Sequence, residues 1–249
     1  MAVFLRDTPG RRRFRRGAGA RSPGGVQHLF FITGGHDVSR LPHRTPRSRL
    51  NPPARPLKLP RMTEDQVRQI FRETGALLEG HFILRSGLRS RQYVQCALAL
   101  QQMPVVERLG AALAAKVRSL GAATVIAPAM GGLVIGQEVA RQLGLRFIFT
   151  EKEDGRLVLR RGFTIAAGEP MLVVEDVITK GGRVQETMAL VQATGGQVRG
   201  VAILVDRSDG GVQLGVPLFS LLTLKVENFP PDQLPPDLSA IPPVKPGGK

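Results

Sequence analysis

The sequence predicts an α/β fold with an open, mostly parallel, twisted sheet and helices on both faces. From residue 123 onward, short apolar runs alternate with segments of helical periodicity, which is typical of consecutive βαβ units. The run Leu172-Val173-Val174 is apolar at successive positions, as expected for a strand that is buried on both faces. Gly195 and Gly196 follow one helical segment and mark its expected end.

The part of the chain before this alternation is predicted to contain two helices separated by extended segments. Thr63 and Gln66 have the spacing of a capping box, and the apolar residues after them recur at helical spacing, up to a stop at Gly80. The expected elements are a helix over 64–79, extended segments over 81–87 and 91–98, and a helix over 104–118.

The alternating part supplies the sheet and its covering helices. Glycine turns lead into both of its helices. The expected elements are strands over 123–128, 146–151, 171–175, 198–206 and 219–227, with helices within 131–144 and over 183–194.

Positive charge is concentrated at one end of the chain. The formal net charge is +15, and residues 1–61 hold 13 Arg and one Lys against two Asp, a balance of +12. This segment is rich in Pro and Gly and has no sustained periodicity, so we expect it to be disordered. We predict a basic extension over 1–61, a folded domain over 62–230 and a Pro-rich, irregular tail over 231–249.

Three interpretations of the basic extension are open. Its charge would suit an arm that binds nucleic acid. Its Arg-rich, acid-poor composition also fits an organelle-targeting peptide, although its prolines interrupt an amphipathic helix. The third interpretation is an upstream extension with Met62 as the working start, because a capped helix begins directly after that residue. We favour the third, and nucleic acid is therefore not an expected partner.

Composition also argues against disulfide-linked and membrane-spanning proteins. Cys96 is the only cysteine, so an intrachain disulfide is impossible, which suits a reducing cytoplasm. No apolar run approaches the roughly 20 residues that a membrane-spanning helix needs. We expect a cytoplasmic protein without a membrane partner.

The stretch MLVVEDVITKGGR, residues 171–183, joins a strand end to a glycine-containing turn. Ligands of open parallel sheets bind beyond the carboxyl ends of the strands, where Glu175 and Asp176 stand. The turn leads into a helix N-terminus, whose free N–H groups and partial positive charge favour a phosphate. Gly181 and Gly182 let the backbone approach a ligand closely, so the turn is a candidate phosphate cradle.

The two acids require a different ligand group, because carboxylates repel phosphate. Vicinal hydroxyls are the natural choice, since a carboxylate accepts hydrogen bonds from both. Acids for a diol beside a cradle for a phosphate predict a ribose 5-phosphate site. The alternative is that the acids form a solvated strand end and the glycines only make a turn.

Three segments of the chain resemble known phosphoribosyltransferase motifs. VVEDVITKGG, residues 173–182, is similar to the phosphoribosyl-diphosphate (PRPP) signature of type I phosphoribosyltransferases. LLEGHFILRSGLRSRQYV (77–94) and LVDRSDGG (204–211) resemble the substrate segment and the Asp-Arg turn of the orotate phosphoribosyltransferase family. The resemblance covers about 64–226. It implies that 62–230 is a phosphoribosyltransferase domain, with a small N-terminal hood beside the main sheet.

The resemblance implies roles for the residues of the acidic stretch. The two acids would hold the ribose hydroxyls, and the loop after them would hold the 5-phosphate. In many relatives a longer, mobile loop with Lys and His side chains corresponds to residues 151–162, and here Lys152 is the best counterpart. Glu175, Asp176 and Lys152 are the expected catalytic residues. The expected PRPP-binding residues are Lys152, Glu175, Asp176, Val177, Ile178, Thr179, Lys180, Gly181, Gly182 and Arg183.

Orotate would contact a second set of residues. Thr179, Arg207 and Arg85 are expected there, and the planar guanidinium of Arg207 suits the carboxylate of orotate. Tyr93 falls where an aromatic residue often stacks on the base, although core packing explains it equally well. In the pyrophosphate loop, PAMGG (128–132), Gly131 stands where many relatives have Lys.

The implied reaction converts PRPP and orotate into orotidine 5′-phosphate and pyrophosphate, a step of pyrimidine biosynthesis. Mg²⁺ is the implied cofactor, held mainly through PRPP and water rather than by protein ligands. The resemblance also implies a homodimer. Two alternatives are kept: a phosphoribosyltransferase for another base, and a PRPP-binding regulator that contacts DNA through the basic extension.

Overall fold

The computed structural model describes residues 61–84 and 86–246, and the structural statements below refer to these residues. Arg85 and residues 1–60 of the basic extension lie outside them. The helices are α1 (Glu64–Glu73), α2 (Cys96–Leu100), α3 (Met103–Val117), α4 (Gly132–Leu143), α5 (Gly182–Ala193) and α6 (Pro236–Ser239), with a 3₁₀ turn η2 (Arg118–Leu120). The strands are β1 (Leu77–Ile83), β2 (Arg89–Val94), β3 (Thr124–Pro128), β4 (Arg146–Glu153), β5 (Arg156–Leu159), β6 (Pro170–Ile178), β7 (Gln197–Asp206), β8 (Leu218–Thr223) and β9 (Asn228–Phe229).

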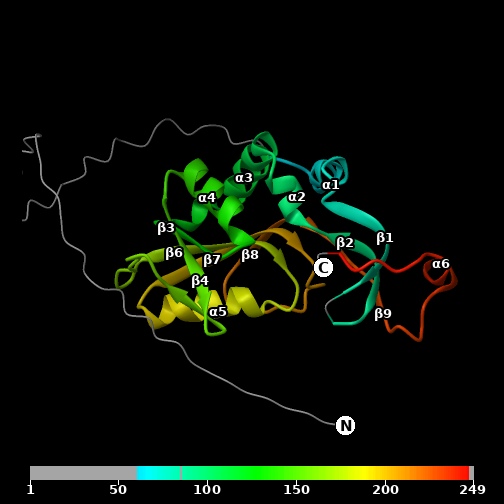
Figure 1. Ribbon diagram of the computed structural model, residues 1–249. Coiled ribbons are helices and arrows are strands. Elements are labelled where there is room, and N and C mark those ends of the chain that lie inside the picture. The colour runs from blue at the N-terminus through cyan, green and yellow to red at the C-terminus, as the bar shows by residue number, and fades with distance from the viewer. Residues whose placement is uncertain (1–60, 85, 247–249) are drawn as a thin grey trace, which may run out of the picture. The chain divides into compact units, whose positions relative to one another are not determined.

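The main sheet has six strands in the order β5-β4-β3-β6-β7-β8. Neighbouring strands from β4 to β8 pair in parallel, and only β5 runs antiparallel to its neighbour β4. In Figure 1, α3 and α4 cover one face of this sheet and α5 covers the other. The predicted mostly parallel sheet with helices on both faces is therefore confirmed.

The hood is a separate, small antiparallel sheet with the order β1-β2-β9. It lies beside the main sheet, next to α1 (Figure 1). Val244 forms a bridge with Phe82 of β1, and Ile83 donates a backbone hydrogen bond to Val244 at 2.8 Å. His81 is buried, and its Nδ1 lies 2.8 Å from the carbonyl oxygen of Ile241. Residues 241–244 are thus bound to the hood by hydrogen bonds.

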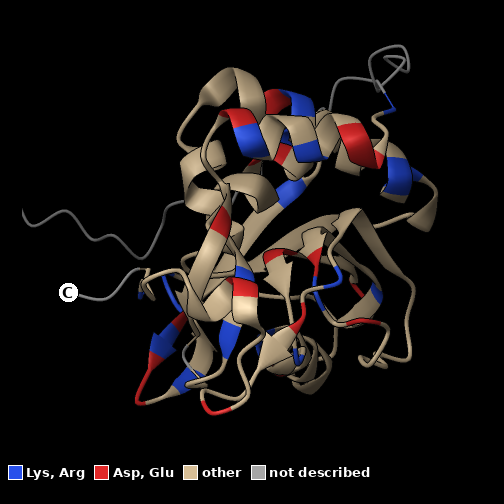
Figure 2. Cartoon of the chain, turned by 90° about the vertical axis from the view of Figure 1, so that its right-hand side faces the viewer, with Lys and Arg blue, Asp and Glu red and all other residues tan. Residues whose placement is uncertain are grey.

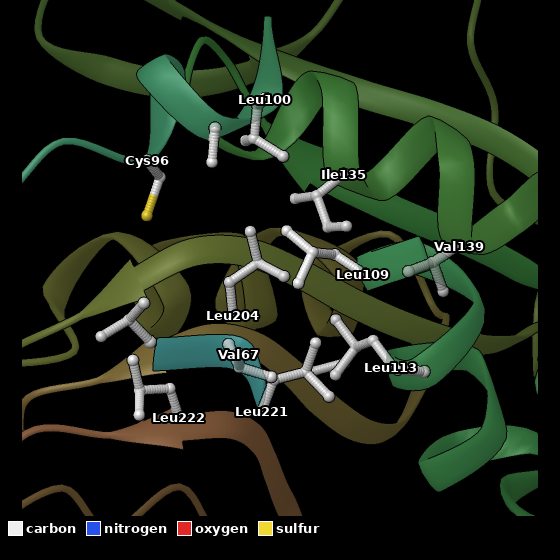
Figure 3. Packing of buried hydrophobic residues seen from close by; sticks show 14 of the residues in the cluster. Val67, Cys96, Leu100, Leu109, Leu113, Ile135, Val139, Leu204, Leu221 and Leu222 are labelled. Carbon is white, nitrogen blue, oxygen red and sulfur yellow. The ribbon is translucent and has the colours of Figure 1, made fainter. Parts of the chain in front are cut away.

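The hydrophobic core is divided by the main sheet into two clusters. The larger one joins α1, α2, α3 and α4 to the sheet, and Figure 3 shows Leu109 and Leu113 meeting Ile135, Leu204 and Leu221 there. The smaller one lies between the sheet and α5, with Val173 and Val184 among its members. This two-sided burial explains why the central strands are apolar at successive positions.

Three predicted segments differ in the structure. The capping box of Thr63 and Gln66 is present, but the helix predicted over 64–79 ends at Glu73, and Leu77 begins β1 instead. Gly75 has a φ of +70°, which breaks the helix before the apolar pattern ends. The segment over 91–98 is split, because Cys96 starts α2. The tail predicted as irregular contains α6 and the pairing of Val244.

Charge is evenly mixed over the described residues. Figure 2 shows basic and acidic residues interspersed along the chain, in keeping with the near balance of +3 in residues 62–249. Among the described residues, none of the helices combines the length and the apolar character that crossing a bilayer would require.

Gly136 sets the distance between α4 and the main sheet. A Cβ atom at this position would lie 2.8 Å from the Cβ of Ala127 and 2.9 Å from Cε2 of Phe147. We expect Gly136→Ala to lower the free energy of unfolding by about 1–3 kcal/mol, because overpacking outweighs the gain in helix propensity. Urea denaturation measures the change. Gly182→Ala is the control, since a Cβ there meets no atom within 4 Å. Equal stability of the two variants would contradict the prediction.

Candidate active site

The site lies where the connections of the main sheet reverse direction. β3 and β6 are neighbours, and the chain leads outward from β3 to β4 on one side and from β6 to β7 on the other. Such a switch point leaves a crevice at the carboxyl ends of the two strands, where open α/β sheets bind ligands. The loop after β3 holds residues 129–131, and the acidic stretch ends β6.

A pocket of about 280 Å³ occupies the end of β6 and the start of α5. Eight of the predicted PRPP-binding residues line it, together with Val184, which was not predicted. Lys180 is exposed and Lys152 lies on β4, and neither lines the pocket. The lining residues are Glu175, Asp176, Val177, Ile178, Thr179, Gly181, Gly182, Arg183 and Val184.

Glu175 and Asp176 have different environments although they are adjacent. Only 2% of Glu175 is exposed, whereas Asp176 is half-buried. Burial raises the pKa of Glu175 to about 9, and the neighbouring charge of Asp176 adds to this effect. Oε1 of Glu175 accepts a hydrogen bond from the backbone N–H of Asp176 at 3.3 Å, while Oε2 is buried and has no partner among the described residues. An unpartnered buried carboxyl oxygen is suited to a ligand hydroxyl.

Asp176 rests against the loop that follows β3. Its Oδ1 accepts a hydrogen bond from the backbone N–H of Val177 at 2.8 Å. A Cβ atom on Gly131 would lie 2.6 Å from this same Oδ1. Gly131 therefore leaves room for the carboxylate, and the loop after β3 and the end of β6 form one continuous wall.

The turn before α5 has the geometry of an anion cradle. Gly181 is the N-cap of α5 with a φ of +78°, and it has no side chain that could cap the first N–H groups. A Cβ there would also lie 2.9 Å from Cγ1 of Val212. Both the left-handed backbone and the close packing require glycine. The N–H groups of the first turn remain free for a ligand, and Arg183 adds a positive charge beside them.

Arg207 lies beside the pocket rather than in its lining. It follows β7, and its backbone N–H donates to the carbonyl oxygen of Ile178 at 2.9 Å. Burial lowers the pKa of its guanidinium, and in the part of the chain that the structure describes its Nε has no hydrogen-bond partner. Burial raises the pKa of the Cys96 thiol, the charges of Asp176 and Glu175 raise it further, and Arg207 opposes them. These four side chains thus share one neighbourhood, and Tyr93 of the hood is also close to Arg207.

Comparison with known proteins assigns the chain to a family. Residues 97–214 match the phosphoribosyl transferase domain. Orotate phosphoribosyltransferase of Pelotomaculum thermopropionicum is 50% identical over 188 residues, which are 76% of this chain and 99% of that protein. The chain belongs to the orotate phosphoribosyltransferase family.

Two further relatives agree with this assignment. Orotate phosphoribosyltransferase of Heliobacterium modesticaldum is 50% identical over 190 residues, covering 76% of this chain and 100% of that protein. A crystal structure of orotate phosphoribosyltransferase from Aeropyrum pernix is 26% identical, with a TM-score of 0.57, covering 64% of this chain and 94% of that one. The family predicted from the three motifs is confirmed.

The segment predicted as the counterpart of the family's mobile loop is a β-hairpin. β4 and β5 pair antiparallel, with Glu153 opposite Arg156. Asp154 and Gly155 form the turn, and both have positive φ, as a type I′ turn requires. The Asp-Gly pair between short apolar runs was the sequence signal for this hairpin. Lys152 is exposed on β4, and its role in binding PRPP stays a prediction.

Proposed function

We propose that this chain transfers the ribose 5-phosphate group of PRPP to orotate, giving orotidine 5′-phosphate and pyrophosphate. The observation that carries the proposal is that Glu175, Asp176 and the glycine turn of α5 line the same pocket. A diol and a phosphate monoester on one ligand fit these two ends of the pocket, and the chain belongs to a family named for this transfer.

Each end of the pocket has a distinct task. Asp176, the more exposed acid, accepts hydrogen bonds from the ribose hydroxyls, and Glu175 carries a proton and can also donate one through its unpartnered Oε2. The free N–H groups at the start of α5 bind the 5-phosphate, with Thr179 and Arg183 beside them. The sugar is thereby fixed at three points, which presents its anomeric carbon in one orientation.

The reaction needs no covalent intermediate with the protein. The bond between the anomeric carbon and the pyrophosphate oxygen breaks, its electron pair leaves with pyrophosphate, and a ring nitrogen of orotate bonds to the opposite face. Holding the two reactants in line lowers the entropic barrier. Positive groups near the departing pyrophosphate stabilise its charge in the transition state. Lys152 is our candidate for this second task.

Mg²⁺ is part of the same proposal. Within residues 61–84 and 86–246, no group of three or more His, Cys, Asp or Glu side chains is arranged to hold a metal ion. The pocket offers two adjacent acids, which fits an ion that is bound mainly by phosphates and water with one or two carboxylates. Bound with PRPP, the ion would neutralise charge on the pyrophosphate.

Turnover of PRPP with different bases tests the proposed reaction. The full chain should form orotidine 5′-phosphate from orotate and should be far slower with adenine or hypoxanthine, which lack a carboxylate. Faster turnover of a purine would establish the alternative of another base. Absence of turnover with all bases, together with salt-sensitive DNA binding that depends on residues 1–61, would establish the regulator instead.

Arg207 is expected to select orotate. Its buried, unpartnered Nε can donate to the carboxylate of the base in a charge-assisted bond. We predict that Arg207→Ala raises KM for orotate by about 10- to 150-fold, the range of a lost hydrogen bond to a charged group, and changes KM for PRPP little. Steady-state kinetics with each substrate varied in turn measures both values. Lys225→Ala is a control, because Lys225 is exposed and its ammonium group pairs with Asp209 at 3.5 Å. Equal effects on both substrates would refute the assignment.

The homodimer and the cytoplasmic location are also proposed. Met130 and Val134, at the start of α4 beside the pocket, are 77% and 39% exposed, which favours contact with another surface. Light scattering on the purified chain should give twice the mass of one chain. The buried, unpaired Cys96 is compatible with a reducing compartment.

A further inference from the structure

The β4–β5 hairpin is attached to the helix that carries the phosphate cradle. Oε1 of Glu186, on α5, accepts a hydrogen bond of 2.6 Å from the backbone N–H of Leu157 on β5. This bond is short and charge-assisted, which places it among the stronger hydrogen bonds of proteins. Glu186 is one turn beyond Arg183 on the same helix, so one rigid element forms both the cradle and the attachment.

The attachment point is directly opposite Lys152. Leu157 and Lys152 are partners in the register of the antiparallel pair. Leu157 is buried, and Leu159, two residues further on β5, packs against the cluster that contains Val184. A bond that fixes Leu157 on the edge strand therefore also fixes the segment of β4 that carries Lys152.

Lys152 projects from the side of the sheet that α5 covers. Side chains alternate between the faces of a strand, so Ile148, Thr150 and Lys152 share one face of β4. Ile148 packs in the cluster beneath α5, which identifies that face. Thr150 is paired with Pro128, the last residue of β3, so Lys152 extends beyond the carboxyl edge where the site lies.

The other charges of the hairpin are neutralised locally. Glu153 pairs with Arg160 at 3.1 Å and Glu151 pairs with Arg161 at 2.8 Å. Among the described residues, no carboxylate lies within ion-pair distance of Lys152. Its ammonium group is thus available for a ligand, whereas Glu151 and Glu153 are paired with arginines.

We propose that Glu186 is a positioning residue, which fixes the β4–β5 hairpin on α5 so that Lys152 is held in place to meet the pyrophosphate of PRPP. The proposal rests on the proposed function, because it takes PRPP as the ligand. Glu186 does not contact the substrate itself. It acts through the Leu157 amide and the strand register, whether Lys152 serves its own pocket or that of a second copy.

A double-mutant cycle tests whether Glu186 acts through Lys152. We expect Lys152→Ala to lower kcat/KM for PRPP by about a hundredfold, as loss of a transition-state contact does. Glu186→Ala should lower it by roughly ten- to a hundredfold, because a misplacement near 1 Å has such effects. The double variant should be no worse than Lys152→Ala alone. The proposal would be overturned if the losses of kcat/KM in the two single variants multiplied in the double variant. It would also be overturned if Lys152→Ala were as active as the unaltered chain.

Two further measurements separate positioning from general support of the fold. Glu186→Gln retains an oxygen acceptor and should recover most of the activity, whereas Glu73→Ala, at an exposed acid of α1, should change nothing. Hydrogen exchange at the Leu157 amide should accelerate at least tenfold in Glu186→Ala and remain slow in Lys152→Ala. Unchanged exchange at Leu157 would refute the attachment. Hydrogen exchange at the Leu157 amide decides the attachment even if orotate is not turned over, so its outcome is separate from that of the proposed function.

Discussion

Asp176→Asn is expected to lower kcat/KM of the proposed reaction by about a thousandfold, the upper range for loss of one transition-state stabilising group. The carboxylate is half-buried on the pocket wall and is held by the backbone N–H of Val177 at 2.8 Å. Asparagine keeps the size of the side chain but replaces one of the two carboxylate oxygens that accept hydrogen bonds from the ribose hydroxyls, and it removes the negative charge. It also loses the favourable interaction with the positive ribose of the transition state.

The measurement is steady-state formation of orotidine 5′-phosphate at saturating orotate. The free energy of unfolding should stay within about 1 kcal/mol of the unaltered chain, because the substitution is isosteric and partly exposed. Asp232→Asn, at an exposed position of the tail, is the matched control and should retain full activity. An Asp176→Asn variant with activity within tenfold of the original would remove this residue from the proposed mechanism.

The sheet and the glycine turn before α5 could be predicted because their signals are local. The apolar run before Glu175 and the glycines after Thr179 lie within one short stretch, and they specify a buried strand, a turn and a helix start in sequence. The same locality explains the capping box of α1. No distant contact is needed to recognise any of these features.

The errors arose where distant contacts decide the structure. Leu77 and Leu78 continue the helical spacing of α1, but they pair with Val94 and Tyr93 of β2, and this pairing outweighs local periodicity. Val244 is likewise held by the hood across more than 150 residues of sequence. A local pattern does not contain this information.

The site itself shows the same limit. Arg207 and Tyr93 come from different sheets, and only the fold brings them to Cys96 and the two acids. The burial of Glu175 could also not be predicted from the sequence, because the end of a strand can be exposed to solvent or covered by other elements. Its near-complete burial changes its chemistry, since the raised pKa keeps this carboxyl protonated at pH values where an exposed acid ionises.

Glu175→Gln is expected to be more stable than the unaltered chain at pH 8. The ordinary pKa of this carboxyl is 4.5, and burial raises it to about 9 in the folded protein. Below pH 4.5 the group is protonated in both states. As the pH rises from there, the unfolded chain ionises freely while the folded chain keeps its proton, so the cost to stability grows until the pH passes the folded pKa and stays at its maximum above it. Glutamine is neutral throughout and has no such cost.

The difference in unfolding free energy between Glu175→Gln and the unaltered chain should therefore grow between pH 5 and pH 8, to about 1–3 kcal/mol in favour of the variant. Each pH unit is worth at most about 1.4 kcal/mol, and the gain is smaller because the amide brings a donor into a place where the acid had an unpartnered oxygen. Urea denaturation without PRPP at both pH values measures this difference, and groups that do not interact with Glu175 cancel between the two proteins. A pH-independent difference would show that Glu175 is ionised in the folded state. Glu175 would then carry no proton, and the unequal roles given to the two adjacent acids here would be wrong.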